Sequence, residues 1–85
     1  MLILYCQIVR IYNMKNIELI KLGQKIKFER LKRNMSQEIL AEKANISIHG
    51  LSNIETGKTD VKYSNLQNIA KAFEMRLCEL LDFNL

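Results

Sequence analysis

The chain has 85 residues, of which 48% are apolar and 26% charged, and its formal net charge is +4. This length and balance predict one small globular domain and argue against a disordered chain. Proline is absent and glycine occurs three times, which favours helices joined by tight turns over a β-rich fold. No apolar run is long enough to cross a bilayer. The two cysteines, Cys6 and Cys78, lie far apart without a metal-ligand pattern, so we expect reduced thiols, no metal, no cofactor and a cytoplasmic location.

The first thirteen residues, MLILYCQIVRIYN, are apolar and β-branched, unlike the rest of the chain. We therefore expect an N-terminal extension over 1–14 and a folded domain over 15–85. The extension lacks the charged start and the small-residue cleavage site of a signal peptide. Three alternatives stay open: an arm or strand that covers a dimer, a tail, or a segment upstream of a true start at Met14. The last is favoured, because MKNIELIKLG already makes a sensible start to the domain.

The first helix is predicted over 17–33, where apolar residues recur with roughly helical period: Ile17, Ile20, Leu22, Ile26, Phe28 and Leu31. Positions 15–33 also hold seven basic residues against Glu18 and Glu29, a local net charge of +5. Such a run can be a solvated helix face. If a nucleic-acid-binding motif lies next to it in the chain, the same run would instead be a footprint for phosphates. Asn34 is the predicted end of the helix.

Two short helices are predicted next, over 37–44 and 48–55. Ser36 and Ser47 are the expected N-caps, because a serine hydroxyl accepts a backbone N–H of the first turn. Asn45 tolerates the left-handed conformation that a sharp turn requires. Residues that can face the core fall on the inner side of both helices: Leu40, Ala41, Ala44, Ile46, Leu51 and Ile54. This spacing, over 37–56, is typical of a helix-turn-helix, whose second helix enters the DNA major groove.

The rest of the chain continues as helices. Gly57 is the predicted stop of the third helix, and 58–62 form a loop. A fourth helix is predicted over 63–73, with Leu66, Ile69, Ala70 and Phe73 at helical spacing, and a fifth over 76–82. The fold class is therefore all-α, with five helices.

Four pieces of the chain, LGQKIKFER, MSQEILAEKANIS, LSNIETGK and LQNIAKAF followed by ELL, carry a resemblance to a known family. Between Leu22 and Leu81 the sequence resembles the Cro/repressor-type helix-turn-helix regulators of bacteria and phages, also called the xenobiotic-response-element family. The resemblance implies a compact, five-helix, lambda-repressor-like domain. It also implies binding to double-stranded operator DNA, usually as a homodimer.

The outward face of the third helix is the predicted base-contacting surface, formed by Ile48, His49, Ser52 and Asn53. Asn53 can pair with adenine through two hydrogen bonds, and His49 can donate to guanine. Ile48 can touch only a thymine methyl group. Gly50 is unusual inside a helix, where glycine costs about 1 kcal/mol relative to alanine. It is expected either to permit close approach to the second helix or to the DNA backbone, or simply to make the third helix softer.

The predicted phosphate contacts are Gln37, Ser47, Lys58 and Lys27, with Lys25 and Lys32 as weaker candidates. The role of Gln37 is implied by the resemblance, in which the glutamine that opens the second helix bonds a phosphate and braces the third. The resemblance also implies a partly buried ion pair between Arg30 and Glu55, which ties the first helix to the third.

The C-terminal part of the sequence has more apolar residues than one small core can absorb. They are the candidate contacts of a homodimer: Phe73, Met75, Leu77, Leu80, Leu81 and Phe83. A two-fold dimer would set two third helices about 34 Å apart, one duplex turn, and predicts a near-palindromic operator.

The predicted function is that of a sequence-specific transcriptional regulator, with repression favoured. The alternatives are an antitoxin or another protein-interaction module of the same fold, with a toxin or other protein as partner, or the controller protein of a restriction-modification locus. An enzyme is not expected, because the sequence offers one histidine, no phosphate-cradling glycine loop and no paired carboxylates in a plausible cleft.

Overall fold

The computed structural model describes residues 16–83, and over them the chain forms five helices and no strand. The helices are α2 (Asn16–Lys32), α3 (Gln37–Ala44), α4 (Ile48–Glu55), α5 (Tyr63–Ala72) and α6 (Leu77–Leu80). The all-α, five-helix prediction is confirmed, and α3 and α4 have the predicted bounds. The last helix is shorter than the 76–82 expected. The question of an extension over 1–14 lies outside the described residues.

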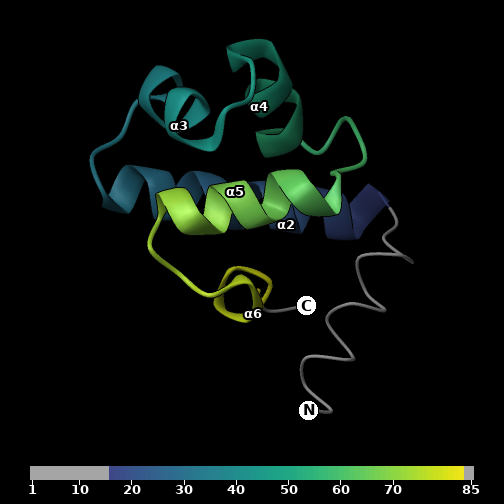
Figure 1. The fold of residues 1–85 in the computed structure, drawn as a ribbon. Helices are drawn as coiled ribbons and strands as arrows, with labels where there is room; N and C mark the ends of the chain where they lie inside the picture. Colours follow the sequence, from purple (N-terminus) through teal and green to yellow (C-terminus); the bar gives the residue numbers. More distant parts are fainter. Residues whose placement is uncertain (1–15, 84–85) are drawn as a thin grey trace.

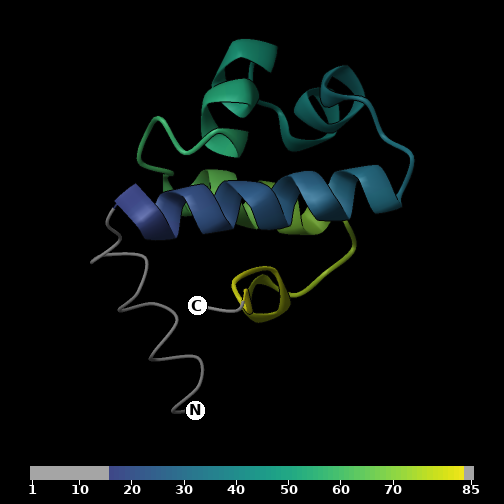
Figure 2. The same cartoon turned by 180° about the vertical axis from the view of Figure 1, so that it is seen from behind.

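The helices are arranged around α2 and α5, which run across the middle of the domain (Figures 1 and 2). The pair α3 and α4 lies on one side of them, and α6 lies on the opposite side. α3 packs against α4 and α5, α2 packs against α4, and α6 packs against α5. One side of the domain is therefore formed by α3 and α4 alone.

The ends of the helices follow from local chemistry. The hydroxyl groups of Ser36 and Ser47 accept hydrogen bonds from the backbone N–H groups of Ile39 and Gly50, at 3.1 and 2.9 Å. Asn34 and Asn45 adopt the left-handed conformation, each with a φ of 57°, and Gly57 does so with 73°. These caps and stops are the predicted ones, and they set the sharp turn between α3 and α4.

The core is built from the inner faces of all five helices. Its fully buried side chains are Leu22, Ile26, Leu40, Leu51, Leu66, Ile69, Leu80 and Leu81. Within the predicted apolar set of α2, Leu22 and Ile26 enter this core. Ile17, Ile20, Phe28 and Leu31 are exposed instead, so that set spans two faces of the helix.

The prediction that six C-terminal apolar residues form a dimer surface needs correction. Phe73, Leu80, Leu81 and Phe83 are buried in the core of the single chain. Met75 and Leu77 are half-buried and pack against it. The core absorbs these residues because α6 packs back against α5 and places its apolar side chains in the same cluster. Of the six candidates, only Met75 and Leu77 keep substantial exposed surface.

Candidate nucleic-acid interface

The C-terminal end of α4 is fixed against α2 by close backbone contact. A Cβ atom added at Gly23 would lie 2.5 Å from the carbonyl oxygens of both Ile54 and Glu55. One at Gly57 would lie 2.8 Å from the Cα of Ile20. Real Cβ atoms do not approach so closely, so the two helices reach this separation only because glycine stands at both positions. Gly23 was not among the predicted site residues, although a glycine inside a helix is itself a signal of close packing.

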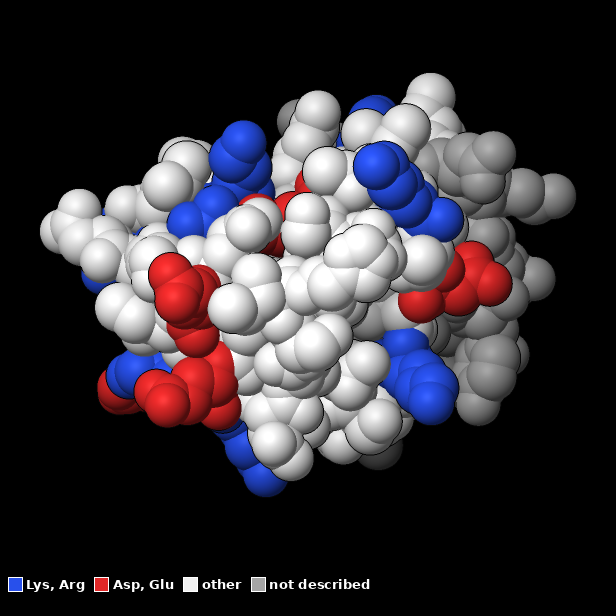
Figure 3. Space-filling model, turned by 90° about the horizontal axis from the view of Figure 1, so that it is seen from above, with Lys and Arg blue, Asp and Glu red and all other residues white. Residues whose placement is uncertain are grey.

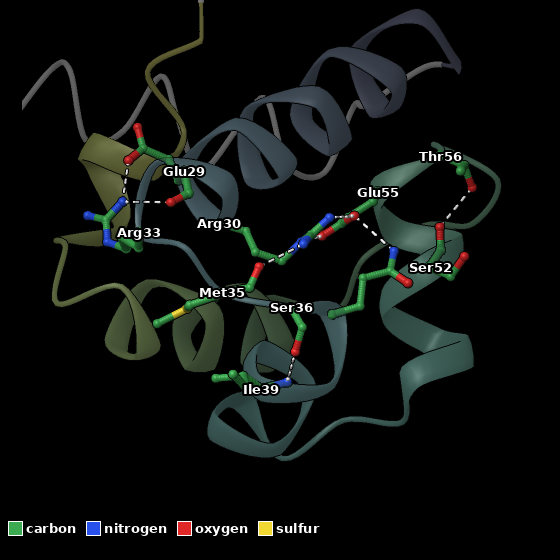
Figure 4. A network of polar contacts seen from close by, with 10 residues as sticks. Glu29, Arg30, Arg33, Met35, Ser36, Ile39, Ser52, Glu55 and Thr56 are labelled. Carbon is green, nitrogen blue, oxygen red and sulfur yellow. Dashed lines mark hydrogen bonds and ion pairs between the residues drawn. The ribbon is translucent and has the colours of Figure 1, made fainter.

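A buried polar network holds the same end of α4 (Figure 4). The guanidinium of Arg30 donates to both carboxylate oxygens of Glu55, from Nε at 2.7 Å and from Nη2 at 3.2 Å. Its third nitrogen, Nη1, donates to the carbonyl oxygen of Met35 at 2.8 Å. Arg30 thus ties α2 to the end of α4 and to the turn before α3.

Gln37 joins this network from the first residue of α3. Its Nε2 donates to Glu55 Oε1 at 3.0 Å. An amide nitrogen carries two hydrogens, so the second remains free to donate outward. The side chain is half-buried, and it connects the anchor of α4 to the surface.

The four predicted base-contacting residues share the outer face of α4. Ile48 and His49 are exposed, and Ser52 and Asn53 are half-exposed. The backbone carbonyls of Ser52 and Asn53 accept from the hydroxyl of Thr56 at 2.9 and 3.3 Å, which closes the last turn (Figure 4). The opposite face of α4 is buried through Leu51 and Ile54. The outward side chains are therefore presented on a helix whose position is fixed by other residues.

Gly50 does not mediate close contact with α3. A Cβ atom there would meet only the hydroxyl oxygen of Ser47, at 2.9 Å. The expectation of close helix approach at Gly50 is wrong, and Gly23 fills that role on α2. The lack of a side chain leaves a bare stretch of backbone on the first turn of α4.

The predicted phosphate contacts surround this helix. Gln37 and Ser47 stand at the starts of α3 and α4, and the exposed Lys58 follows α4. The hydroxyl of Ser47 accepts from Gly50, and its own hydrogen can still be donated. Lys27 is exposed on α2, one turn beyond Gly23.

Charge on this side of the domain is divided by region (Figure 3). Its middle is mainly uncharged, and lysine and arginine lie around the periphery together with acidic side chains, some at the edge where α3 lies and some at the opposite edge. Glu38 and Glu42 are the exposed acids of α3. A neutral centre with basic groups around it suits contacts with base edges flanked by contacts with phosphates.

A second buried carboxylate, that of Glu29, lies on another face of α2, and its partners were not among the predicted contacts. Glu29 is 3% exposed and forms ion pairs with Lys25, Lys32 and Arg33. Arg33 also donates to the carbonyl oxygen of Phe73, at 3.1 Å, and stacks over its ring. Burial opposes ionisation of Glu29, but its hydrogen bonds with these cations outweigh burial and lower its pKa to about 2. The cluster joins α2 to the end of α5.

Together these features define the class of protein. Two short helices meet at a sharp turn, and the second presents a polar outer face while its far end is anchored to α2. This is the architecture of a helix-turn-helix DNA-binding protein. The chain belongs to the helix-turn-helix family, whose model matches residues 26–80, and it is a DNA-binding regulator of that family.

Two relatives narrow the comparison. The chain is 42% identical over 69 residues to control protein C.BamHI of Bacillus amyloliquefaciens, an alignment that covers 80% of this chain and 84% of that protein. Its fold is similar to the crystal structure of the restriction-modification controller protein C.AhdI from Aeromonas hydrophila. That match has a TM-score of 0.74 and 28% identity, and it covers 75% of this chain and 97% of the other.

Within residues 16–83, no helix is long and apolar enough to cross a membrane. The same residues contain no cluster of three or more His, Cys, Asp or Glu side chains that could hold a metal ion.

Proposed function

We propose that the chain is a restriction-modification controller protein that binds a near-palindromic operator as a homodimer, with α4 in the major groove. The observation that carries DNA recognition is the outer face of α4, with Ile48, His49, Ser52 and Asn53 accessible on an anchored helix. The controller type is supported by the relation to C.BamHI, which extends over most of both chains. Such a role requires no catalysis, and it is carried out in the cytoplasm.

The side chains of α4 divide the work by their chemistry. Asn53 presents an amide that can pair with adenine, and His49 can donate to guanine N7 or O6. Ser52 can bond either a base or a phosphate, whereas Ile48 offers only an apolar contact to a thymine methyl group. The geometry therefore supports one apolar and up to three polar base contacts in each half-site.

Phosphate contacts would fix the position of α4 in the groove. The free N–H of Gln37 and the hydroxyl of Ser47 stand at two neighbouring helix N-termini, which favour an anion. Lys58 and Lys27 add cationic contacts on either side of them. Because Gln37 also bonds Glu55, a phosphate held by Gln37 is coupled directly to the anchor of α4.

The dimer would place two copies of α4 about 34 Å apart, one turn of the duplex. Met75, in the turn between α5 and α6, and Leu77, the first residue of α6, are the remaining candidates for the two-fold contact among the residues first considered. Bound across a promoter, the dimer represses by blocking polymerase. We propose no toxin partner, since both of these relatives are controller proteins.

Selection of binding sites from random duplex DNA, at two salt concentrations, tests this proposal. We expect enrichment of an inverted repeat whose half-sites are centred one helical turn apart. The affinity should fall with salt, because lysine contacts displace counterions from the phosphates. Binding that shows no sequence preference and disappears at the higher salt concentration would overturn the proposed operator recognition.

A further inference from the structure

The outer face of α2 carries an apolar stripe that no described helix covers. Ile17, Ile20, Phe28 and Leu31 are 66, 43, 58 and 54% exposed. At about 100° per residue, these four and Gln24 fall within an arc of about 80° on the helix. Leu22 and Ile26 lie on the opposite side and fill the core. We call these five residues the α2 stripe.

Lysines border the α2 stripe on both sides. By the same helical spacing, Lys27 lies along one edge and Lys21, Lys25 and Lys32 lie along the other. A single carboxylate, that of Glu29, forms ion pairs with Lys25, Lys32 and Arg33. Positive charge therefore remains in excess along this edge of the α2 stripe. Lys21 and Lys27 form no ion pair with any residue between 16 and 83. The face is therefore apolar along its centre and cationic along its edges.

A hollow of about 340 Å³ opens beside the stripe, where α2 meets the chain that follows α6. It is lined by Lys21, Gln24, Lys25, Phe28, Asp82 and Phe83. Two aromatic side chains, two lysines and one aspartate are among its lining residues, so the lysines outnumber the acid there. A hollow of this kind suits an apolar side chain whose neighbours carry negative charge.

We propose that the α2 stripe is a docking site for an acidic amphipathic helix of a partner protein. Apolar side chains at i, i+3, i+4 and i+7 of that helix would pack on the stripe and into the hollow. Its flanking Asp and Glu residues would meet Lys21 and Lys27, which form no ion pair within residues 16–83, and Lys25 and Lys32, which share the single carboxylate of Glu29. From Ile17 to Leu31 the stripe is about 21 Å long, so the partner segment has about 14 residues.

This surface is distinct from the proposed DNA contacts. Its central residues lie on α2, whereas the base-contacting residues lie on the outer face of α4. Only Lys27 stands at the border of both. The regulator could therefore hold such a partner while it is bound to its operator, and Lys27 is left out of the test.

The test is NMR titration of the full chain with a synthetic 15-residue helical peptide that carries Leu along one face and Glu on both flanks. A peptide with Lys in place of Glu is the charge control. We expect the Glu peptide to shift amide signals along 17–31 and the Lys peptide to bind at least tenfold more weakly. A double variant, Phe28→Ser with Leu31→Ser, should weaken the Glu peptide at least tenfold, and so should Lys21→Glu. Ile39→Ser, which removes an exposed isoleucine on α3, should not.

DNA binding by the double variant should be unchanged, which separates this proposal from the proposed function. Equal binding of both peptides, or amide signal shifts centred on α3 and α4, would overturn the proposal of a docking site on the α2 stripe. Two other occupants of the α2 stripe are tested separately. Sedimentation tests a second copy of the chain, and peptide binding by a chain that starts at Met14 tests residues 1–13. If the double variant turns a dimer into a monomer, the occupant is a second copy, and the proposal fails. If only the chain that starts at Met14 binds the Glu peptide, the occupant of the α2 stripe is the segment 1–13, and the docking proposal fails in that case too.

Discussion

Arg30 on α2 and Glu55 at the end of α4 meet in a two-point ion pair, with both side chains almost completely buried. The remaining nitrogen of the guanidinium reaches the carbonyl of Met35, and Gln37 adds a third hydrogen bond to Glu55. The position of α4 thus depends on the charged carboxylate of Glu55, whose one charged partner in this ion pair is Arg30.

Removal of Glu55 should be severely destabilising. Glu55→Ala leaves the Arg30 cation buried without a carboxylate, and we expect a loss of about 3–5 kcal/mol in the free energy of unfolding. Urea denaturation measures this loss. Arg30→Met combined with Glu55→Leu should recover a large part of it, because an apolar pair of similar volume leaves no uncompensated charge. A Glu55→Ala variant as stable as the parent would show that the pair contributes little.

The stability of the domain should depend on pH through Glu29. Its pKa is about 2 in the folded state against an ordinary value of 4.5, so its stabilising effect is complete above about pH 4.5 and is lost as the pH falls toward 2. The shift corresponds to about 3 kcal/mol. We expect Glu29→Gln to lose up to about this amount at pH 7, with a difference from the parent that narrows in acid. Urea titrations from pH 7 to pH 3 would show it, and a difference that does not change with pH would contradict the assignment.

Gly23 and Gly50 should respond differently to alanine. Helix propensity alone predicts a gain of about 1 kcal/mol at either position. At Gly23 the new Cβ would strike the carbonyls of Ile54 and Glu55, so we expect a net loss of about 2 kcal/mol. At Gly50 it meets only the capping hydroxyl of Ser47, and loss of the cap, about 1 kcal/mol, roughly cancels the gain. Thermal denaturation of the two variants decides the matter, and equal effects would refute the close contact between α2 and α4.

Asn53 and Lys58 should affect DNA binding in different ways. Asn53→Ala should cost about 1–3 kcal/mol on the selected operator and relax the preference at one base pair. Lys58→Ala should weaken binding to every duplex alike and reduce the slope of affinity against salt by about 1. Fluorescence anisotropy on the operator and on single-base variants separates the two. Identical behaviour of the variants on every duplex would remove the distinction between base and phosphate contacts.

Glu74 ends α5 in the left-handed conformation, with a φ of 56°. A side chain with a Cβ is disfavoured there, so Glu74→Gly should stabilise the domain by about 0.5–1 kcal/mol. Glu42→Gly is a matched control, since Glu42 is an exposed residue within α3 and the same change there should cost about 1 kcal/mol. Urea denaturation should show changes of opposite sign in the free energy of unfolding of the two variants. A loss of stability in both would be evidence against the left-handed turn.

Local features of the fold could be predicted from the sequence because they depend on residues close together in the chain. Ser36 and Ser47 each accept the backbone N–H three residues ahead, at the start of α3 and α4. Asn34, Asn45 and Gly57 follow the ends of α2, α3 and α4 and adopt the left-handed conformation that ends a helix. The bounds of α3 and α4 followed from these signals together with apolar spacing.

Features that depend on distant contacts could not be predicted in the same way. Helical periodicity in α2 indicated a helix, but it could not say which apolar residues face the core when two faces carry them. The count of C-terminal apolar residues suggested a surface, although α6 folds back and buries most of them. The ion pairs of Glu29 span three or four residues and could have been found, whereas the contact of Arg33 with Phe73 bridges 40 positions.

The residues that anchor α4 and the residues that face outward from it are different side chains. Leu51, Ile54 and Glu55 hold the helix, while positions 48, 49, 52 and 53 take no part in the core. A new operator preference can therefore arise by substitution at the outward positions without loss of thermal stability. Divergence of DNA preference among related regulators therefore needs few mutations and no intermediate that fails to fold.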